Sequence, residues 1–251
     1  MSRKGINKFS PQTRARKISY PVLLFISSII WVKMKKTMLH KIYKKLYEAF
    51  GPQHWWPGDT PLEIAVGAIL TQNTNWGNVE KAINDLKRQN ALSAKAVHEM
   101  PVSMLSGIIR PAGYFNIKAG RLKSFIHFLM EKYRGSMKRM KKDETYPLRK
   151  KLLRINGIGP ETADSILLYA LEKPVFVIDA YTRRVLSRHG IMEDKKSYEE
   201  FQNLFHSSLK KDVRLFNEYH ALFVRVGKSY CKKNKPLCEK CPLNHSALIM
   251  S

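Results

Sequence analysis

Two stretches of helix-forming sequence are joined by a turn that leaves almost no room for side chains. The first stretch covers residues 147–155, and the turn Ile155-Asn156-Gly157-Ile158-Gly159 leads directly to Pro160. Proline is favoured at the first position of a helix, where its missing N–H would have had no partner. The second stretch repeats apolar residues at helical spacing: Ala163, Ile166, Leu167, Ala170 and Leu171. The sequence therefore predicts a tight helical hairpin over residues 152–171.

The two glycines give this turn a binding property as well as a shape. Because Gly157 and Gly159 carry no side chain, their N–H groups can approach a phosphate oxygen beside the N-terminus of the second helix. Such a turn binds the sugar-phosphate chain of a nucleic acid without reading its bases. The alternative is an ordinary turn between helices that happens to contain two glycines.

Most of the remaining sequence also has helical periodicity. Thr60-Pro61-Leu62-Glu63 is a capping box, and only Pro174 to Ile178 is typical of a short extended run. No strand pattern of comparable strength occurs, so we expect an all-α fold. Helices are predicted over residues 39–50, 61–70, 75–88, 101–110, 117–133, 147–155, 161–171, 180–189, 197–209 and 212–228, and a basic loop over 134–142.

The charge of the chain limits the class of its partners. The 251 residues include 45 Lys and Arg against 20 Asp and Glu, which gives a formal net charge of +25. A field of this sign attracts polyanions, of which nucleic acid is the commonest for a soluble protein. A membrane surface is the competing partner.

The first 37 residues differ from the rest of the chain. They hold nine Lys or Arg, no Asp or Glu, and the apolar run Tyr20 to Val32. As a helix, this run would span only about 20 Å of a hydrocarbon core about 30 Å thick. We therefore expect no membrane span. We expect residues 1–37 to be either a poorly ordered basic arm or sequence ahead of a native start at Met34 or Met38, because the amphipathic pattern begins at Leu39.

An acidic residue follows the extended run. Asp179 comes directly after Val175-Phe176-Val177-Ile178 and shortly before Arg183 and Arg184. A carboxylate at the end of a buried run is unfavourable unless it is capped, paired or catalytic. Asp179 is thus a candidate catalytic acid, and an ordinary helix N-cap is the alternative.

Four segments together resemble the helix-hairpin-helix DNA glycosylases of the endonuclease III type, over roughly residues 39–245. They are the hairpin 155–159, Val177-Ile178-Asp179, Ile69-Leu70-Thr71-Gln72-Asn73-Thr74, and the cysteine motif 231–243. The resemblance implies two helical lobes, with DNA and an extruded base at the cleft between them, and Asp179 as the catalytic carboxylate. The central lobe would span about 60–165, and the second lobe about 38–59 plus 166–251.

One departure from the family pattern bears on the reaction. Bifunctional members carry a lysine two residues after the second hairpin glycine, where this chain has Glu161. A carboxylate cannot form the Schiff base that strand cleavage needs. We therefore expect a monofunctional glycosylase in which Asp179 activates water or stabilises an oxocarbenium-like sugar.

Within the family, the segments 55–57, 70–74, 114–119 and 159–164 most resemble the 3-methyladenine DNA glycosylase III type. This resemblance implies excision of an alkylated purine in base excision repair. Two alternatives stay open: an endonuclease III-like glycosylase and abasic-site lyase for oxidised or mismatched bases, and a DNA-binding module without catalysis. Glu161 argues against the lyase, and the retained Asp179 argues against the module.

The resemblance also implies a base pocket. Trp55, Trp56 and Trp76 are candidates to sandwich a cationic base, and Lys228 stands at the position of a pocket lysine. That type of enzyme usually has phenylalanine at the position of Trp76. The alternative is core packing for the tryptophans and a solvated side chain for Lys228.

The expected partner is double-stranded DNA that contains a damaged base. Besides the two hairpin glycines, the candidate contacts are Gln72, which would fill the gap left by the extruded base, Arg183, Arg184 and the stretch 138–142. Each charged side chain has solvation as its alternative. Binding should depend strongly on salt because phosphate contacts release counterions.

Three cysteines bunch near the end of the chain. Cys231, Cys238 and Cys241 resemble the family's cluster motif, but its fourth cysteine falls at Ala247, and His245 is the substitute ligand nearby. Two outcomes are open: a loaded [4Fe-4S] cluster, or a degenerate site without iron. In either case no cofactor is expected to be required for the chemistry. Cysteines of this kind indicate a reducing compartment, so we expect a cytoplasmic, nucleoid-associated monomer.

Overall fold

A computed structural model describes residues 20–55 and 58–244, with residues 20–33 and 35 described by their backbone alone. No strand occurs within these ranges, so the all-α prediction is confirmed. 3-10 turns lie at Arg110–Ala112 and Cys238–Lys240, and a π-helical segment lies at Ile166–Ala170. The α-helices are α1 (Tyr20–Phe50), α2 (Pro61–Leu70), α3 (Trp76–Arg88), α4 (Ala94–Glu99), α5 (Val102–Ile108), α6 (Phe115–Tyr133), α7 (Met137–Met140), α8 (Thr145–Leu152), α9 (Pro160–Ser165), α10 (Ala180–Arg188), α11 (Tyr198–Ser208) and α12 (Val213–Ser229).

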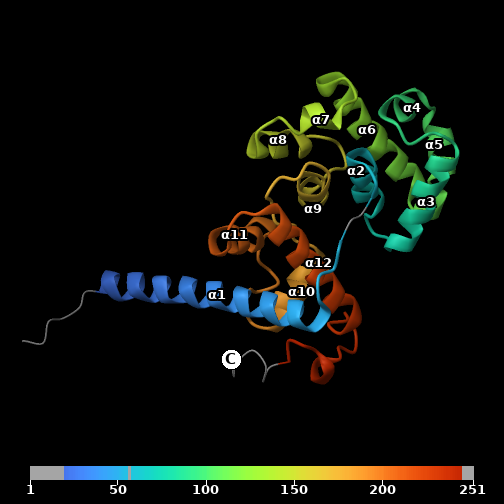
Figure 1. The fold of residues 1–251 in the computed structure, drawn as a ribbon. Helices are drawn as coiled ribbons and strands as arrows, with labels where there is room; N and C mark the ends of the chain where they lie inside the picture. Colours follow the sequence, from blue (N-terminus) through green and yellow to red (C-terminus); the bar gives the residue numbers. More distant parts are fainter. Residues whose placement is uncertain (1–19, 56–57, 245–251) are drawn as a thin grey trace, which may run out of the picture.

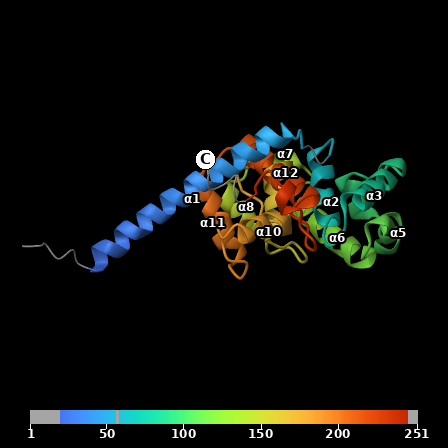
Figure 2. The same cartoon turned by 90° about the horizontal axis from the view of Figure 1, so that it is seen from below.

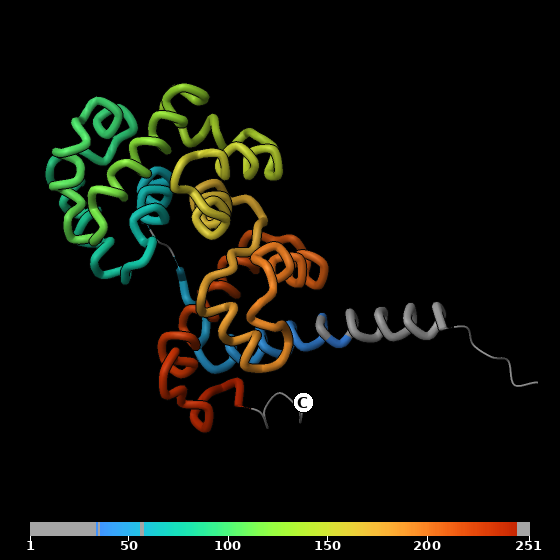
Figure 3. The backbone as a smooth tube through the Cα atoms, turned by 180° about the vertical axis from the view of Figure 1, so that it is seen from behind, coloured from blue at the N-terminus to red at the C-terminus, as the bar shows by residue number. Residues whose placement is uncertain are grey.

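The helices form two lobes (Figure 1). One lobe holds α2 to α9, and the other holds α1 and α10 to α12, as the view from behind also shows (Figure 3). The chain crosses between the lobes twice, after α1 and again before α10. The π-helical segment packs against α2 and α9. The first lobe therefore extends to about Leu171 and not to residue 165.

Helix α1 is longer than the sequence pattern indicates. It begins at Tyr20, so the boundary expected at residues 37 and 38 lies inside a continuous helix; residues 1–19 lie outside the described ranges. Its first half extends away from the body of the protein (Figure 2). Its second half packs on α11 and α12 through Leu39, Ile42 and Leu46, all fully buried. No helix in the described ranges is long and apolar enough to cross a bilayer.

Local capping signals set many of the helix starts. Thr60 accepts a hydrogen bond from the N–H of Glu63 at the start of α2, and Ser197 forms a full capping box on α11. Two short helices were not expected: α4, which Ser93 caps, and α7, which Ser136 caps within the supposed loop 134–142. Both are too short for a periodic apolar pattern, so only their caps could have indicated them.

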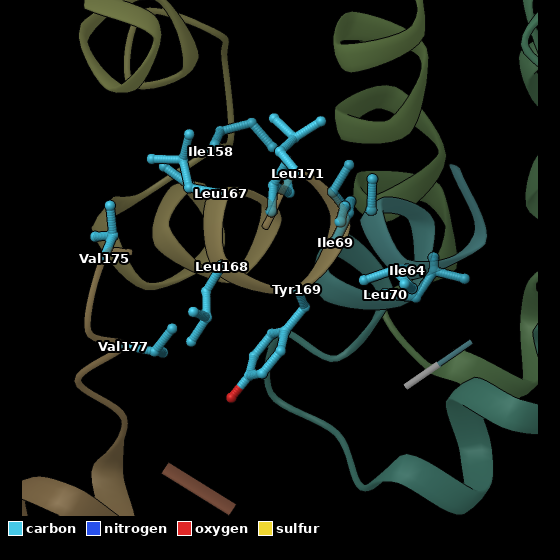
Figure 4. Close-up of a cluster of buried hydrophobic side chains, with 14 of the residues drawn as sticks. Ile64, Ile69, Leu70, Ile158, Leu167, Leu168, Tyr169, Leu171, Val175 and Val177 are labelled. Atoms are coloured by element: carbon cyan, nitrogen blue, oxygen red, sulfur yellow. The ribbon is translucent and has the colours of Figure 1, made fainter. Parts of the chain in front are cut away.

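The hairpin is attached to the first lobe by an apolar cluster. Ile158, Leu167 and Leu171 pack beside Ile69 and Leu70 of α2 (Figure 4), and each of these side chains is at most 4 % exposed. Packing of this density fixes the orientation of both hairpin helices, because any shift would open a cavity. The turn 155–159 is thus carried on a rigid support.

A buried polar network joins three helices across the two lobes. Asp164 of α9 is fully buried and accepts hydrogen bonds from Arg149 Nε of α8 at 2.6 Å and Nη2 at 2.9 Å. Gln202 of α11 donates to the same carboxylate at 2.7 Å and to the carbonyl of Phe176 at 2.8 Å. A buried carboxylate is tolerated only when its oxygens are satisfied in this way.

Removal of the arginine from this network should destabilise the protein strongly. In Arg149→Met the buried Asp164 loses its bidentate partner, and breaking such a pair costs about 3–5 kcal/mol of unfolding free energy. Urea unfolding checks this, with Arg154→Met, an exposed arginine nearby, as the matched control. Equal midpoints for the two variants would contradict the importance of the network.

Candidate active site

Asp179 stands immediately before α10 and is largely buried, with 8 % of its surface exposed. Its Oδ1 accepts a hydrogen bond from the N–H of Thr182 at 2.7 Å, so it does cap the helix. The backbone at Asp179 is extended, with φ −98° and ψ 179°. One carboxylate oxygen thus serves the helix and the other remains available to another group.

Among the described residues no strand lies beside the extended run before Asp179, and side chains of α11 satisfy its backbone instead. The N–H of Phe176 donates to Nε2 of His206 at 2.9 Å, and the N–H of Ile178 donates to the hydroxyl of Tyr198 at 3.2 Å. Burial lowers the pKa of His206 to about 4, so this imidazole is neutral and can accept. Buried backbone groups need such partners, and these partners hold Asp179 at a fixed place.

The second carboxylate oxygen faces a histidine that the sequence analysis missed. Oδ2 of Asp179 lies 3.5 Å from Nε2 of His220 on α12, and Nδ1 of His220 is hydrogen-bonded to the hydroxyl of Tyr169. His220 is 6 % exposed and Tyr169 is 8 % exposed. Both residues sit in apolar helical patterns, and no spacing in the sequence relates them to Asp179.

These contacts set the charge of the acid. Burial raises the pKa of Asp179, but His220 and the hydrogen bond from Thr182 lower it by more, so the pKa lies below its ordinary value. The carboxylate is therefore ionised at neutral pH. A fixed negative charge in a site with little water can stabilise a developing cation, or accept a proton from an attacking water.

The two hairpin glycines differ in how strictly the structure requires glycine at their positions. Gly157 has φ +83°, and a Cβ there would lie 2.2 Å from the side chain of Arg121. Gly159 has an ordinary φ of −86°, and a Cβ there would meet nothing within 4 Å. Within the described part of the chain, neither N–H has a backbone acceptor. The space in front of Gly159 is thus open to an external group.

Gln72 lies against this hairpin. Its Nε2 donates to the carbonyl of Gly157 at 3.0 Å and to the hydroxyl of Thr162 at 2.9 Å, and its Oε1 accepts from Arg121. Its predicted role as the residue that fills the gap of an extruded base stays a prediction. The structure adds that its amide is held at the hairpin turn.

The pocket residues are placed only in part. Lys228 Nζ lies 6.0 Å from the ring centroid of the half-buried Trp55, so these two predicted residues do come together. Trp56 lies outside the described residues. Trp76 begins α3 and its ring covers Gly67 of α2, where a Cβ would lie 3.3 Å from it, which matches the packing alternative.

The two arginines expected on DNA are bound within the protein. Arg183 donates to the carbonyls of Asp194 and Lys196, and Arg184 donates to the carbonyls of Gly227 and Cys231. Arg184 therefore ties α10 to the end of α12. A DNA contact by either guanidinium stays a prediction.

The cysteine segment 231–241 does not form a closed ligand set. Cys231 and Cys241 are buried and Cys238 is exposed, and the described ranges contain no group of three His, Cys, Asp or Glu side chains placed to hold a metal ion. His245 and Ala247 lie outside those ranges. Arg188 donates instead to the Cys231 sulfur at 3.3 Å and to the two carbonyls after it. Loading of a cluster at this segment stays a prediction, and no step is derived through one.

Two cavities lie away from Asp179. One, of about 460 Å³, lies between α8 and α11; the other, of about 510 Å³, borders the hairpin at Ile155 and Asn156. Asp179 lines neither of them. Asp179 lies instead at the end of the second segment that crosses between the lobes, just before α10.

Glu161 shares the electrostatic environment of the acid. It lies in the first turn of α9 and is exposed to solvent, yet the protein around it raises its pKa to about 7, first through desolvation and then through the charge of Asp179, with His220 opposing. The carboxylate at the position of the family's lysine thus lies within electrostatic reach of Asp179.

An open glycine turn and an ionised buried acid, carried on two helical lobes, define a helix-hairpin-helix protein that acts on DNA. The sequence profile described as "HhH-GPD superfamily base excision DNA repair protein" matches residues 66–211. The Methanocaldococcus jannaschii protein named "Putative DNA repair glycosylase MJ1434" is 47% identical over 215 residues, which cover 85% of this chain and 97% of that protein. The chain therefore belongs to the HhH-GPD superfamily and is a DNA glycosylase of base excision repair.

More distant proteins share the sequence pattern or the fold. Endonuclease III of Thermotoga maritima is 25% identical, with 83% of this chain and 92% of that protein covered. The crystal structure of H. pylori 3-methyladenine DNA glycosylase (MagIII) bound to 1,N6-ethenoadenine has a TM-score of 0.65 at 27% identity, covering 79% of this chain and 97% of that one. A non-covalent endonuclease III–DNA complex has a TM-score of 0.73 at 22% identity, covering 84% and 94%, which shows the shared fold.

The raised pKa of Glu161 predicts a pH-dependent effect on stability. Between pH 4.5 and about 7 the unfolded chain loses this proton before the folded protein does, so unfolding becomes easier as the pH rises. Glu161→Gln should therefore have a higher Tm than wild type at pH 8, and an equal Tm at pH 4.5. Calorimetry at both values checks this, with Glu80→Gln, exposed on α3, as the control for loss of one surface charge. A constant Tm difference at both values would contradict the raised pKa.

Proposed function

We propose that the protein is a monofunctional DNA glycosylase that removes an alkylated purine by hydrolysis of the N-glycosidic bond. The observation that carries the proposal is the pair of carboxylates: Asp179 is ionised and buried, and Glu161 stands where a lyase needs an amine. Without an amine no Schiff base forms. The base is therefore released and the DNA strand is left unbroken at the abasic site.

Hydrolysis of such a lesion needs few protein groups. An alkylated purine carries a positive charge, so it leaves as a neutral base when the bond to C1′ breaks. The sugar becomes oxocarbenium-like, and the Asp179 carboxylate stabilises this cation. Water then adds its oxygen to C1′ and gives up a proton to the carboxylate, which releases the proton to solvent.

The approach of Lys228 to Trp55 supports a base site at this end of α12. An indole face that attracts an ammonium group also attracts a cationic base. The H. pylori structure, solved with 1,N6-ethenoadenine, supports a modified adenine as the ligand class. For this chain the individual lesion is part of the proposal.

The reaction is tested with three duplexes that carry a methylated purine, an oxidised pyrimidine or a mismatch. We expect base release from the methylated duplex and strand breaks only after hot alkali. Breaks before alkali would contradict the monofunctional reaction, and unchanged DNA in all three would contradict catalysis.

Asp179→Asn should then lower the single-turnover rate of base release by about 10²-fold or more, because it removes the charge that stabilises the transition state. The asparagine can still cap α10, so DNA affinity should remain at the wild-type level in the same buffer. An unchanged rate would remove Asp179 from the mechanism.

We also propose that base release needs no iron–sulfur cluster. The backbone of residues 231–233 is held by Arg184 and Arg188, and the proposed reaction uses a carboxylate and water. Protein prepared with and without added iron should release the base at the same rate. Iron per chain, measured in the same preparations, checks this; a rate that rises with iron content would overturn it.

A further inference from the structure

A buried tyrosine and a buried histidine lie behind the acid and have no role in the reaction described above. The distance from His220 Nε2 to Asp179 Oδ2 is 3.5 Å. On the other side of the ring, Nδ1 of His220 is hydrogen-bonded to the hydroxyl of Tyr169. We propose that Tyr169 and His220 form a relay of hydrogen bonds that positions the Asp179 carboxylate. The proposal rests on the proposed catalytic role of Asp179.

The three residues come from both lobes. Tyr169 belongs to the π-helical segment of the first lobe, where the N–H of Leu171 donates to the carbonyl of Ile166 at 3.1 Å. Its ring points away from Ile158 and the other apolar residues of the hairpin cluster (Figure 4). A π-helical turn changes the direction of the side chains it carries and is often found at functional sites. Here it aims the phenol at the second lobe.

The hydrogen-bond inventory fixes the direction of the relay. Burial, together with the charge of Asp179, raises the pKa of Tyr169 well above its ordinary value, so the phenol keeps its proton. Within the described residues, His220 Nδ1 is the acceptor that this buried hydroxyl has. Tyr169 therefore donates to Nδ1, which places the imidazole proton on the other ring nitrogen, Nε2.

That proton points at the acid. The buried Nε2 of His220 has no other hydrogen-bond partner in the described part of the chain. A distance of 3.5 Å is long for a hydrogen bond, and catalytic hydrogen bonds often tighten only when substrate is bound. With Thr182 N–H on Oδ1 and His220 on Oδ2, both oxygens of Asp179 are oriented from the protein side.

The titratable groups around the acid are His220 from α12, Tyr169 from the π-helical segment and Glu161 from α9. Glu161 carries negative charge once the pH rises past its pKa of about 7, and that charge opposes ionisation of Asp179. The relay opposes that effect by offering a donor to the ionised form. Loss of the relay should therefore raise the pKa of Asp179.

Tyr169→Phe tests the relay because it removes one hydroxyl and keeps the ring. Tyr133→Phe is the matched control: Tyr133 is also buried and donates to a carboxylate, Asp143, in the first lobe. The first readout needs no substrate. In ¹⁵N spectra of the histidine-labelled protein, His220 should show the Nε2–H tautomer in wild type and in the control, and a mixture of tautomers in Tyr169→Phe.

The second readout is the titration of the Asp179 carboxyl carbon by ¹³C NMR. Its pKa should rise in Tyr169→Phe, and by about one to two pH units in His220→Phe, which removes the donor itself. The third readout is the rate of release of a methylated purine under single-turnover conditions. We expect the maximal rate to fall and the enzyme concentration that gives half of this rate to stay the same. This rate should fall about 2- to 10-fold in Tyr169→Phe. The acid limb of its pH profile should move to higher pH.

The outcomes separate the relay from the proposed function. An unchanged tautomer and an unchanged Asp179 titration in Tyr169→Phe would overturn the relay, whatever the substrate. If these spectra change as expected while no lesion is released by wild type, the relay stands and the proposed reaction fails. If His220→Phe does not fold, Tyr169→Phe still decides the question.

Discussion

The arrangement of this protein depends on keeping one carboxylate ionised in a place where water has little access. Asp179 is 8 % exposed, and burial alone favours its protonated form. The N–H of Thr182 and the imidazole of His220 reverse that preference. Because both contacts need Asp179 at one position, the run of residues 175–178 must be extended and fixed. The side chains that α11 contributes to this run are thus part of the site.

The environment of the acid is assembled from both lobes. Asp179 and His220 belong to the second lobe, whereas Tyr169 and Glu161 belong to the first. A small rotation of one lobe would separate these groups. The buried pair of Arg149 and Asp164, completed by Gln202, resists such a rotation because it connects α8, α9 and α11. The stability of this remote network and the charge state of Asp179 are therefore coupled.

Part of the fold and of the candidate site could be predicted from the sequence, because it depends on local chemistry. The hairpin 155–159 and the position of Asp179 follow from glycine, proline and N-cap preferences, which act over a few residues. Tyr169 and His220 are 51 positions apart, and the sequence pattern around each is that of a core residue. Their contact depends on how the two lobes dock, which the sequence does not indicate. Arg184 makes a further contact that the sequence does not predict. A basic residue on a helix surface indicates solvent or DNA, and the structure adds a hydrogen bond from Arg184 to the carbonyl of Gly227 near the end of α12.

The distribution of charge suits the proposed substrate, a cationic base in an anionic DNA strand. The net charge of +25 acts on phosphates across solvent, where salt screens it within about 8 Å. The carboxylates of Asp179 and Glu161 act over short distances in a desolvated region, where the same charge has a larger effect. The surplus of basic residues therefore holds the backbone of DNA without cancelling the field at the sugar. With a pKa of about 7, Glu161 adds a second negative charge as the pH rises through neutrality, which strengthens the field that favours the cationic base of the proposed reaction.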